Sequence, residues 1–391
     1  MRPVLFVTGH APAYRVGALA RLHELEDIEV ALFGGRAKHG GGVFEGVMPF
    51  PHRHVRPREL ALLAARGRYR AVVCSTGGRT ALIATWAGAR ASRRPLLLWA
   101  SLWAHPRTAA HALSYLPLRR LYRSADAVVT YGPHVSAYVR RRGARNVHVA
   151  AQSVDNEFWQ SSEVAPPGEV PAPSEVAPLS EVAPPGEVAP PGEPGWPADA
   201  ALKVLFVGRA AREKGLQVLL EAWRRSGLRP PGAALVLAGV GAESLGSGAA
   251  DCLAERAAGV HRLEPVPAVR LRSIYAAADL LVLPSIATRT FLEPWGLVVN
   301  EAMNRGLPVI ASDAVGAAAG GLVRDGRNGL VVPAGDADAL AAAIARLAGD
   351  ESLRTRLGAA AAVDVRAYGH DAWARGFSEA LASLGLSRGH C

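Results

Sequence analysis

The chain has 391 residues, half of them apolar, and it carries a formal net charge of +10. This length allows two domains with sizeable cores. Cys74, Cys252 and Cys391 are too few and too scattered for a disulfide framework or a zinc site, so we expect a reduced, cytoplasmic setting. Val4–Val7 is too short for a secretory signal, and no apolar run reaches the roughly 18 residues that a membrane-spanning helix needs.

The basic charge is concentrated in the first part of the chain. Residues 1–160 hold 23 Arg or Lys and 9 Asp or Glu, a balance of +14, whereas residues 161–391 hold 21 and 25, a balance of −4. Clusters occur at Arg53–Arg58, Arg119–Arg123 and Arg140–Arg142. They indicate either a surface that faces anionic lipid or a lipid diphosphate, or an ordinary solubilising surface in an Arg-rich chain. Nucleic acid is not expected as a partner, because the basic runs lack interleaved aromatic residues.

The first 160 residues alternate short apolar runs with helical patterns, which is typical of parallel βα units. The expected strands are Val4–Thr8, Ile28–Phe33, Ala71–Ser75, Leu96–Trp99, Ala127–Thr130 and Val147–Ala150. The expected helices include Val16–Glu26, Arg79–Ala91, Ala109–Arg123 and His134–Arg142.

A tandem repeat occupies residues 162–197. Glutamates recur at positions 163, 169, 175, 181, 187 and 193, and those at 163, 181 and 187 each open the hexapeptide Glu-Val-Ala-Pro-Pro-Gly. The proline density excludes a β-ladder, and in polyproline II every Glu would share one edge of a rod approaching roughly 110 Å. We expect a disordered segment that loops out, produced by repeat expansion at a hinge. A weaker hypothesis is that its six negative charges fold back on the basic first domain.

From Leu202 onward the pattern again predicts βα units. The expected strands are Leu202–Val207, Ala234–Ala238, Asp279–Leu283, Val309–Ala311 and Gly329–Val332, with a strand end at Leu263–Val266. The expected helices are Gly215–Arg225, Ala268–Ala277, a helix opening near Gly296, Leu340–Leu347 and Asp371–Leu384. Asp336-Ala337-Asp338 has the D-x-D form of a metal signature, but it directly precedes a helix. We therefore expect an N-cap and a first-turn acid there.

The run Glu293–Met303 organises the second half of the chain. Pro294 and Gly296 indicate a helix start, whose free N–H groups and positive end suit a phosphate. Glu293 and Glu301 lie at most roughly 12 Å apart if the span is helical, whereas the nucleophile pair of a retaining glycosidase needs about 5–5.5 Å. The two carboxylates suit the two ends of an elongated, hydroxyl-rich ligand. The alternative is that one Glu caps the helix and the other is solvated.

Glu293–Met303 resembles the E-x7-E motif of the retaining family-4 glycosyltransferases, the glycosyl transferases group 1. The further matches, in the family's order, are Val207-Gly208-Arg209, Glu213-Lys214-Gly215, Ala238-Gly239-Val240-Gly241, Ala278-Asp279, Leu283-Pro284-Ser285, Gly306-Leu307-Pro308-Val309 and Asp325-Gly326-Arg327-Asn328-Gly329. The resemblance covers residues 200–350 well and the first 160 residues loosely.

The resemblance implies an α/β GT-B fold, with two Rossmann-like doubly wound domains facing a central cleft. Residues 1–160 would form an acceptor-binding domain and residues 199–370 a nucleotide-sugar-binding domain, with residues 161–198 as the linker. Residues 371–391 would form a C-terminal helix that packs back on the first domain.

The resemblance also assigns roles around the diphosphate. Arg209 and Lys214, with Gly208 beside them, would bind the departing diphosphate, and the backbone of Gly296, Leu297 and Val298 would bind sugar and phosphate. Protein groups would then supply the positive charge that the departing diphosphate needs, so neither a metal nor another cofactor is expected.

Further roles follow for the rest of the donor. Glu301 would accept hydrogen bonds from the ribose hydroxyls, Glu293 would hold a hydroxyl of the transferred sugar, and the backbone near Val266 would meet the base. Trp295 stands where Phe is commoner in the family, which we expect to alter packing more than chemistry.

The first domain departs from the family pattern. The loop Gly9-His10 follows the first strand and would line the cleft, but it lacks the paired glycines that many members have. The family usually has a histidine after the fourth strand that contacts the transferred sugar. Here Ser101 is nearest that place and His105 lies four residues on. His105 would do this work from a longer loop, or it is simply a surface histidine.

The sequence thus predicts a retaining, metal-independent glycosyltransferase that moves a sugar from a nucleoside diphosphate sugar to a lipid-linked or cell-envelope saccharide. It would be cytoplasmic, with a peripheral place on the inner face of the membrane as one option. The alternatives are a transferase for a soluble small-molecule acceptor and a non-catalytic nucleotide-sugar-binding protein. The base, the sugar, the acceptor and the oligomeric state are left open.

Overall fold

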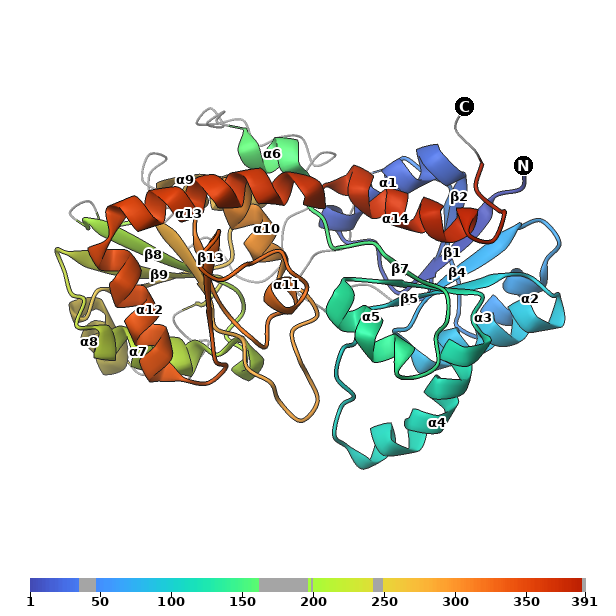
Figure 1. Ribbon diagram of the computed structural model, residues 1–391, viewed down its shortest axis with the longest axis horizontal. Coiled ribbons are helices and arrows are strands. Elements are labelled where there is room, and N and C mark those ends of the chain that lie inside the picture. The colour runs from blue at the N-terminus through green and yellow to red at the C-terminus, as the bar shows by residue number, and fades with distance from the viewer. Residues whose placement is uncertain (35–46, 162–195, 198–199, 242–248, 389–391) are drawn as a thin grey trace. The chain divides into compact units, whose positions relative to one another are not determined.

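The computed structural model describes residues 1–34, 47–161, 196–197, 200–241 and 249–388. These residues form two compact units, each with its own parallel sheet (Figure 1). Within this set, unit 1 takes in residues up to Asp155 together with those from Tyr368 onward, and unit 2 takes in the remainder. Apart from Trp196 and Pro197, the predicted repeat lies outside the described residues.

Unit 1 is built on a sheet of seven parallel strands. Their bounds are β1 Val4–Thr8, β2 Ile28–Leu32, β3 His52–His54, β4 Ala71–Ser75, β5 Leu96–Ala100, β6 Ala127–Thr130 and β7 Val147–Val149. The order is β3-β2-β1-β4-β5-β6-β7. Every residue of β1, β2, β5 and β6 is buried, because helices cover both faces of a parallel sheet.

The helices of unit 1 form a layer on each face of the sheet. Their bounds are α1 Ala13–Glu26, α2 Leu60–Ala65, α3 Arg79–Ala91, α4 Ala109–Ser124, α5 Pro133–Arg140 and α14 His370–Ala382. α1 and α14 pack on one face, and α2 to α5 pack on the other (Figure 1). Helix α14 therefore belongs to unit 1 in space, although it follows all of unit 2 in the sequence.

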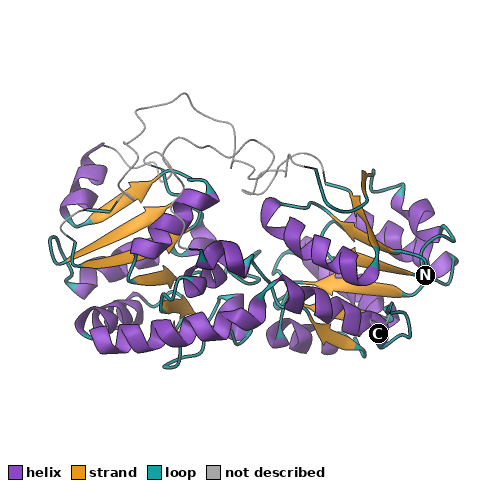
Figure 2. Cartoon of the chain, turned by 90° about the horizontal axis from the view of Figure 1, so that it is seen from above, coloured by secondary structure: helices purple, strands orange, loops and turns teal. Residues whose placement is uncertain are grey.

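Unit 2 has a sheet of six parallel strands. Their bounds are β8 Leu202–Val207, β9 Ala233–Ala238, β10 Val260–Leu263, β11 Leu280–Leu283, β12 Val309–Ser312 and β13 Gly329–Val332, in the order β10-β9-β8-β11-β12-β13. Helices again flank the strands, as the second view shows for each unit (Figure 2).

The helices of unit 2 are mostly short. Their bounds are α6 Asn156–Gln160, α7 Leu216–Ser226, α8 Ala249–Ala257, α9 Ala268–Ala277, α10 Leu297–Asn304, α11 Gly316–Ala319, α12 Ala337–Gly349 and α13 Glu351–Asp364, with 3-10 turns at Arg212–Lys214 and Val365–Tyr368. α7 packs against α12, and α10 contacts α6, α9 and α13.

The chain passes into unit 2 at α6, before the boundary at residue 160 that the sequence predicts. The amide of Asn304 on α10 donates to the side chain of Asn156 (2.9 Å), and the amide of Gln160 donates to Asn304 (2.8 Å). Arg305 also donates to the carbonyls of Gln160 (3.0 Å) and Ser161 (2.9 Å). These bonds hold the α6 segment on unit 2.

The predicted fold class is confirmed, because both units are Rossmann-like α/β domains with parallel sheets. Within the described ranges, no helix has the length and apolarity to cross a bilayer.

Candidate functional site

The sheet of unit 2 reverses its strand order between β8 and β11. In a doubly wound sheet, ligands bind outside the carboxyl ends of the strands at such a reversal. Gly208 and Arg209 follow β8, and Pro284 and Ser285 follow β11. These two loops place the predicted residues at the carboxyl ends of two neighbouring strands in the sheet of unit 2.

A glycine allows the two loops to touch. Gly215 has φ +70, and a Cβ atom on it would lie 1.9 Å from the carbonyl oxygen of Pro284. The amide of Ile286 donates to the carbonyl of Glu213 (2.9 Å). The loop after β8 is therefore fixed against the end of β11, which brings Lys214 next to the loop that carries Glu293.

Lys214 and Glu293 form an ion pair at this edge. The Lys214 Nζ lies 2.5 Å from Oε2 of Glu293, and the two side chains are 18% and 8% exposed. The hydroxyl of buried Ser285 donates to the same Oε2 (3.3 Å). Glu293 is thus a buried carboxylate whose orientation is set by a cation and a hydroxyl, and both of these can be exchanged for ligand groups.

Helix α10 opens directly beside this pair. Its N-cap is Gly296 at φ +93, which has no side chain to cap the first N–H groups. The amide of Val299 bonds the carbonyl of Gly296 (3.0 Å), and the amides of Leu297 and Val298 before it can face an anion. The indole of buried Trp295 donates to Asn300 (2.8 Å), which fixes the chain just before the helix. Leu297 and Val298 lie in the first turn, as the sequence predicts. Neither Glu293 nor Glu301 caps this helix, so the alternative prediction of a capping glutamate is wrong.

Glu301 lies in the second turn of α10 and faces α9. The hydroxyl of Tyr275 donates to its Oε2 (2.9 Å). Burial raises the pKa of Glu301 to about 7, and the hydrogen bond from Tyr275 lowers it. This carboxyl therefore changes its charge near neutral pH, and as a carboxylate it can accept from hydroxyl groups.

The remaining predicted donor residues lie in loops around the same strand ends. Arg209 is well exposed, with its guanidinium 4.0 Å from Glu213. Gly239 follows β9 at φ +84, and a Cβ there would lie 2.9 Å from the carbonyl oxygen of Gly208. Val266 is half-buried in the loop after β10. Lys214 and Glu293 are in direct contact with each other. Arg209 lies near Glu213 instead, and Glu301 bonds Tyr275.

The structure adds two residues whose roles the sequence does not assign. Ser285 bonds Glu293, and Tyr275 bonds Glu301. The sequence marks Ser285 only as part of the match Leu283-Pro284-Ser285, and Tyr275 only as part of a predicted helix. Both roles depend on the pairing of β11 with β8 and on the contact of α9 with α10, which single-sequence patterns do not give.

In unit 1 the loop after β1 carries Gly9 and His10. His10 is exposed, and its ring lies against the backbone of Gly34, whose amide donates to the carbonyl of Gly9 (2.8 Å). This loop lies where β1 and β4 mark the strand-order reversal of unit 1.

His105 has both ring nitrogens engaged within unit 1. Its Nε2 lies 2.7 Å from the carbonyl oxygen of His111, and its Nδ1 lies 3.2 Å from the hydroxyl of Tyr138. A carbonyl only accepts, so Nε2 carries the proton and Nδ1 accepts from the tyrosine. These bonds favour a role in holding the loop before α4 over direct contact with a sugar.

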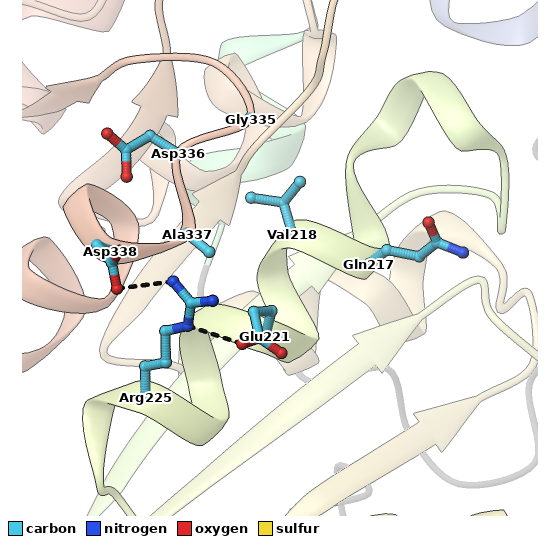
Figure 3. A pocket seen from close by; sticks show the side chains of 8 residues that line it. All are labelled: Gln217, Val218, Glu221, Arg225, Gly335, Asp336, Ala337 and Asp338. Carbon is cyan, nitrogen blue, oxygen red and sulfur yellow. Dashed lines mark hydrogen bonds and ion pairs between the residues drawn. The ribbon is translucent and has the colours of Figure 1, made fainter.

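The D-x-D segment has the structural role that the sequence predicts. Asp336 caps α12 by accepting from the amide of Ala339 (2.9 Å), and Asp338 in the first turn pairs with Arg225 of α7 (2.7 Å). A pocket of about 550 Å³ opens here, lined by Gln217, Val218, Glu221, Arg225, Gly335, Asp336, Ala337 and Asp338 (Figure 3). Arg225 also bonds Glu221 (2.7 Å), and none of the predicted site residues lines this pocket.

Residues 201–350 match the model of the family described as glycosyl transferases group 1. D-inositol 3-phosphate glycosyltransferase of Nocardia farcinica is 39% identical over 191 residues, covering 47% of this chain and 39% of that protein. The lipopolysaccharide core biosynthesis glycosyltransferase LpsE of Rhizobium meliloti is 37% identical over 172 residues, covering 41% and 43%. The chain spans less than half the length of these curated relatives.

Solved structures with the same fold cover nearly the whole chain. HepE of Anabaena, in complex with UDP, has a TM-score of 0.70 and 19% identity, covering 98% of this chain and all of that one. Sucrose-phosphate synthase of Thermosynechococcus elongatus has a TM-score of 0.64 and 18% identity, covering 98% and 99%. Residues 201–350 therefore match the glycosyl transferases group 1 family, and the chain that carries them has the GT-B fold.

Proposed function

We propose that the protein is a glycosyltransferase that takes its sugar from a nucleoside diphosphate sugar. The observation that carries this proposal is the cluster of Lys214, Glu293 and Ser285 at the open N-terminus of α10. It combines a cation and free N–H groups for a diphosphate with a buried carboxylate for hydroxyl groups. Glu301, farther along the same helix, supplies the second carboxylate.

The diphosphate gains negative charge as the bond to the sugar breaks. Lys214 acts as a point charge, and the first amides of α10 donate to the phosphate oxygens. Arg209, which is exposed and only 4.0 Å from Glu213, clamps phosphate oxygens in a bidentate way. These groups stabilise the leaving group without a metal, and we therefore propose metal-independent transfer.

The rest of the donor follows from the same geometry. Glu293 accepts from a hydroxyl of the transferred sugar, and Glu301 accepts from the ribose hydroxyls. The loop at Val266 meets the base. HepE, which shares the fold, has been solved with UDP and with UDP-glucose, so UDP-sugars are the first donors to try.

We infer that transfer retains the anomeric configuration. The resemblance of Glu293–Met303 to the motif of the retaining enzymes supports this inference. Because Glu293 is assigned to a hydroxyl of the transferred sugar, a same-face reaction is favoured over a double displacement on this carboxylate. In a same-face reaction the C1–O bond to the phosphate breaks, a C1–O bond to the acceptor forms, and the acceptor proton passes to the departing phosphate. An inverted product would overturn this inference.

We also infer a lipid-linked or cell-envelope saccharide as acceptor, bound by unit 1 on the cytoplasmic side of the membrane. The basic balance of residues 1–160 supports this inference. Two relatives bear fitting names, LpsE and the phosphatidyl-myo-inositol mannosyltransferase of Mycobacterium leprae, which is 36% identical over 170 residues. Efficient turnover of a soluble inositol phosphate, with none of a lipid-linked saccharide, would contradict it.

The test is release of nucleoside diphosphate from a panel of UDP-, GDP- and ADP-sugars, with and without EDTA. We expect slow hydrolysis of one donor by the wild type, unchanged by EDTA, and none by Glu301→Ala or Arg209→Ala. Arg212→Ala is the matched control, because this exposed arginine lies in the same loop. The proposal fails if no sugar nucleotide is hydrolysed and none raises the melting temperature.

A further inference from the structure

Helix α4 presents apolar side chains to solvent in unit 1. Leu113 is 82% exposed and Leu116 is 69% exposed, and Pro117 beside them is exposed as well. Leu113, Leu116, Arg120 and Arg123 follow one another at intervals of three, four and three residues, so they lie along one face of the helix. This stripe is apolar in its first half and basic in its second.

The opposite side of α4 fixes the helix to unit 1. Leu121 and Tyr122 are buried in the core that α2, α3 and α5 share. The indole of Trp86 on α3 donates to Ser124 (2.9 Å), and Thr108 caps the helix by accepting from the amide of His111 (3.3 Å). These contacts on the buried side of α4 therefore hold its exposed stripe in place.

The stretch of sequence that contains α3 and α4 carries formal charge of one sign. Residues 60–125 contain eleven arginines and no Asp or Glu. Arg119, Arg120 and Arg123 are exposed, and among the described residues they form no ion pair. Arg68 and Arg70, which belong to the same stretch, are by contrast paired with Glu29 and Glu26. Cations left without counter-charges on a structured surface indicate an external anionic partner.

The neighbouring helix α3 extends the same chemistry. Its exposed side includes Arg79, Ile83 and Arg90, and Ile83 is 55% exposed. α3 and α4 cover the same face of the sheet, on the side away from α1 and α14 (Figure 1).

We propose that the exposed face of α3 and α4 docks on a lipid bilayer that contains anionic lipid. Leu113 and Leu116 enter the boundary between headgroups and acyl chains, and Arg119, Arg120 and Arg123 bind the lipid phosphates. Such a helix, with an apolar stripe and a basic one, lies in the plane of the interface without crossing it.

Charge complementarity selects this occupant. In a two-fold dimer the same surface would meet itself and place arginines against arginines. A nucleic acid would match the arginines and leave the leucines in water. An anionic bilayer satisfies both groups at once, because it offers phosphates at its surface and hydrocarbon beneath.

The proposal deepens the inferred membrane-linked acceptor, and it is tested without turnover. We would measure flotation of the full chain with vesicles of phosphatidylcholine alone and of phosphatidylcholine with one third phosphatidylglycerol, at low and high salt. We expect binding to the anionic vesicles only, weakened at high salt because the charges are screened. Leu113→Ser with Leu116→Ser, and Arg120→Gln with Arg123→Gln, should each weaken this binding at least about tenfold.

Matched controls come from other surfaces. Leu253→Ser changes a leucine of unit 2 that is 69% exposed, as Leu116 is, and Arg346→Gln with Arg375→Gln changes two exposed arginines of α12 and α14. These variants should bind vesicles like the wild type. Equal losses in test and control variants, or no binding to anionic vesicles, would overturn the proposal, as would a leucine-dependent dimer that does not bind vesicles. Binding of UDP, measured alongside, reports separately on the donor site.

Discussion

Lys214 and Glu293 form an ion pair, although the proposed function assigns them to different parts of the donor. Lys214 binds the diphosphate, and Glu293 binds a hydroxyl of the transferred sugar. Their distance of 2.5 Å and low exposure make this a charge-assisted bond in a site of reduced water access. A phosphate that draws Lys214 toward itself loosens the hold on Glu293, which then accepts from a sugar hydroxyl. The pair thereby links recognition of the diphosphate to recognition of the sugar.

The first prediction separates the diphosphate from the nucleoside. Lys214→Met should weaken UDP binding by about tenfold to a hundredfold, the value of one charge-assisted contact, and should change uridine binding less than about twofold. Isothermal titration calorimetry with both ligands provides the measurement. Lys203→Met is the control, since Lys203 is the other described lysine and lies within β8. An equal loss of uridine affinity would show that Lys214 does not bind the phosphates.

The second prediction concerns pH. The pKa of Glu301 is raised to about 7, so the neutral carboxyl dominates below that pH and the carboxylate above it. Only the carboxylate accepts from both ribose hydroxyls, and uridine affinity should therefore rise as the pH increases from about 6 to 8. Tyr275→Phe removes a bond that lowers this pKa and should move the midpoint to higher pH.

Glu301→Gln is the control for this titration. Its uridine affinity should be low and independent of pH over the same range. The sign also fixes the contribution of Glu301 to stability: its folded pKa lies above the ordinary value of 4.5, so this contribution to the free energy of unfolding should fall as the pH rises from about 4.5 to 7, and the difference between the wild type and Glu301→Gln measures it. A wild-type uridine affinity that does not change with pH would contradict the role of Glu301.

The sequence predicts part of this site and misses the rest for a definite reason. Arg209, Lys214, Glu293 and Glu301 stand at fixed offsets from glycines and prolines that mark strand and helix ends, so local patterns locate them. Ser285 and Tyr275 act on these residues through contacts between elements. The match Leu283-Pro284-Ser285 marks the position of Ser285 but not its role, and Tyr275 stands in an ordinary helical pattern. Only the packed structure shows which carboxylate each one holds.

At the scale of elements, helix α7 carries a glycine at each end with nearly the same backbone. Gly215 at the N-cap has φ +70, and Gly227 at the C-cap has φ +72. A Cβ on Gly215 would lie 1.9 Å from the backbone oxygen of Pro284, whereas a Cβ on Gly227 would meet nothing within 4 Å. The two glycines therefore have nearly the same left-handed backbone and differ in the atoms that surround them.

The third prediction uses this pair. Gly227→Ala should lower the free energy of unfolding by about 1–2 kcal/mol, the cost of a left-handed residue with a side chain. Gly215→Ala should cost at least about 2 kcal/mol more, because a backbone oxygen cannot rotate away, and it should also weaken UDP binding. Urea unfolding of both variants checks the difference. Equal losses would mean that the contact with Pro284 relaxes freely.

Local patterns predict the elements well where these are buried and regular. Val4–Thr8 and Leu202–Val207 are strands with the predicted bounds, because continuous apolar runs are typical of parallel strands covered on both faces. β3 is missed, since it has three residues and its two histidines are exposed. α13 is missed as well, because its run of small alanines gives little apolar periodicity.

At the scale of the whole molecule, unit 1 is completed by a helix encoded after unit 2. Phe377 of α14 lies in contact with Phe6 of β1 (5.5 Å between ring centroids) and with Trp373 (4.6 Å). All three rings are fully buried. Beyond α14, the carboxylate of Glu26 accepts from Ser387 (2.8 Å) and from the amide of Arg388 (3.1 Å).

The fourth prediction follows from this packing. Phe377→Ala should destabilise unit 1 by about 3–5 kcal/mol, through lost apolar contact and a cavity. UDP binding, which the proposed function assigns to unit 2, should change less than about twofold at a temperature where the variant is folded. Tryptophan fluorescence during urea unfolding gives the first quantity and calorimetry the second. A tenfold loss of UDP affinity would show that α14 supports the donor site.

The place of α14 in the sequence also sets an order of events during synthesis. A ribosome delivers β1 and β5 early, but Trp373 and Phe377 emerge only after every strand of unit 2. Domains usually mature from the N-terminus as they are translated. Here unit 2 can finish first, and until α14 emerges Phe6 and Trp99 of unit 1 lack their contacts with Phe377 and Trp373. We therefore expect unit 1 to reach its full stability only after α14 has emerged and packed on β1 and β5.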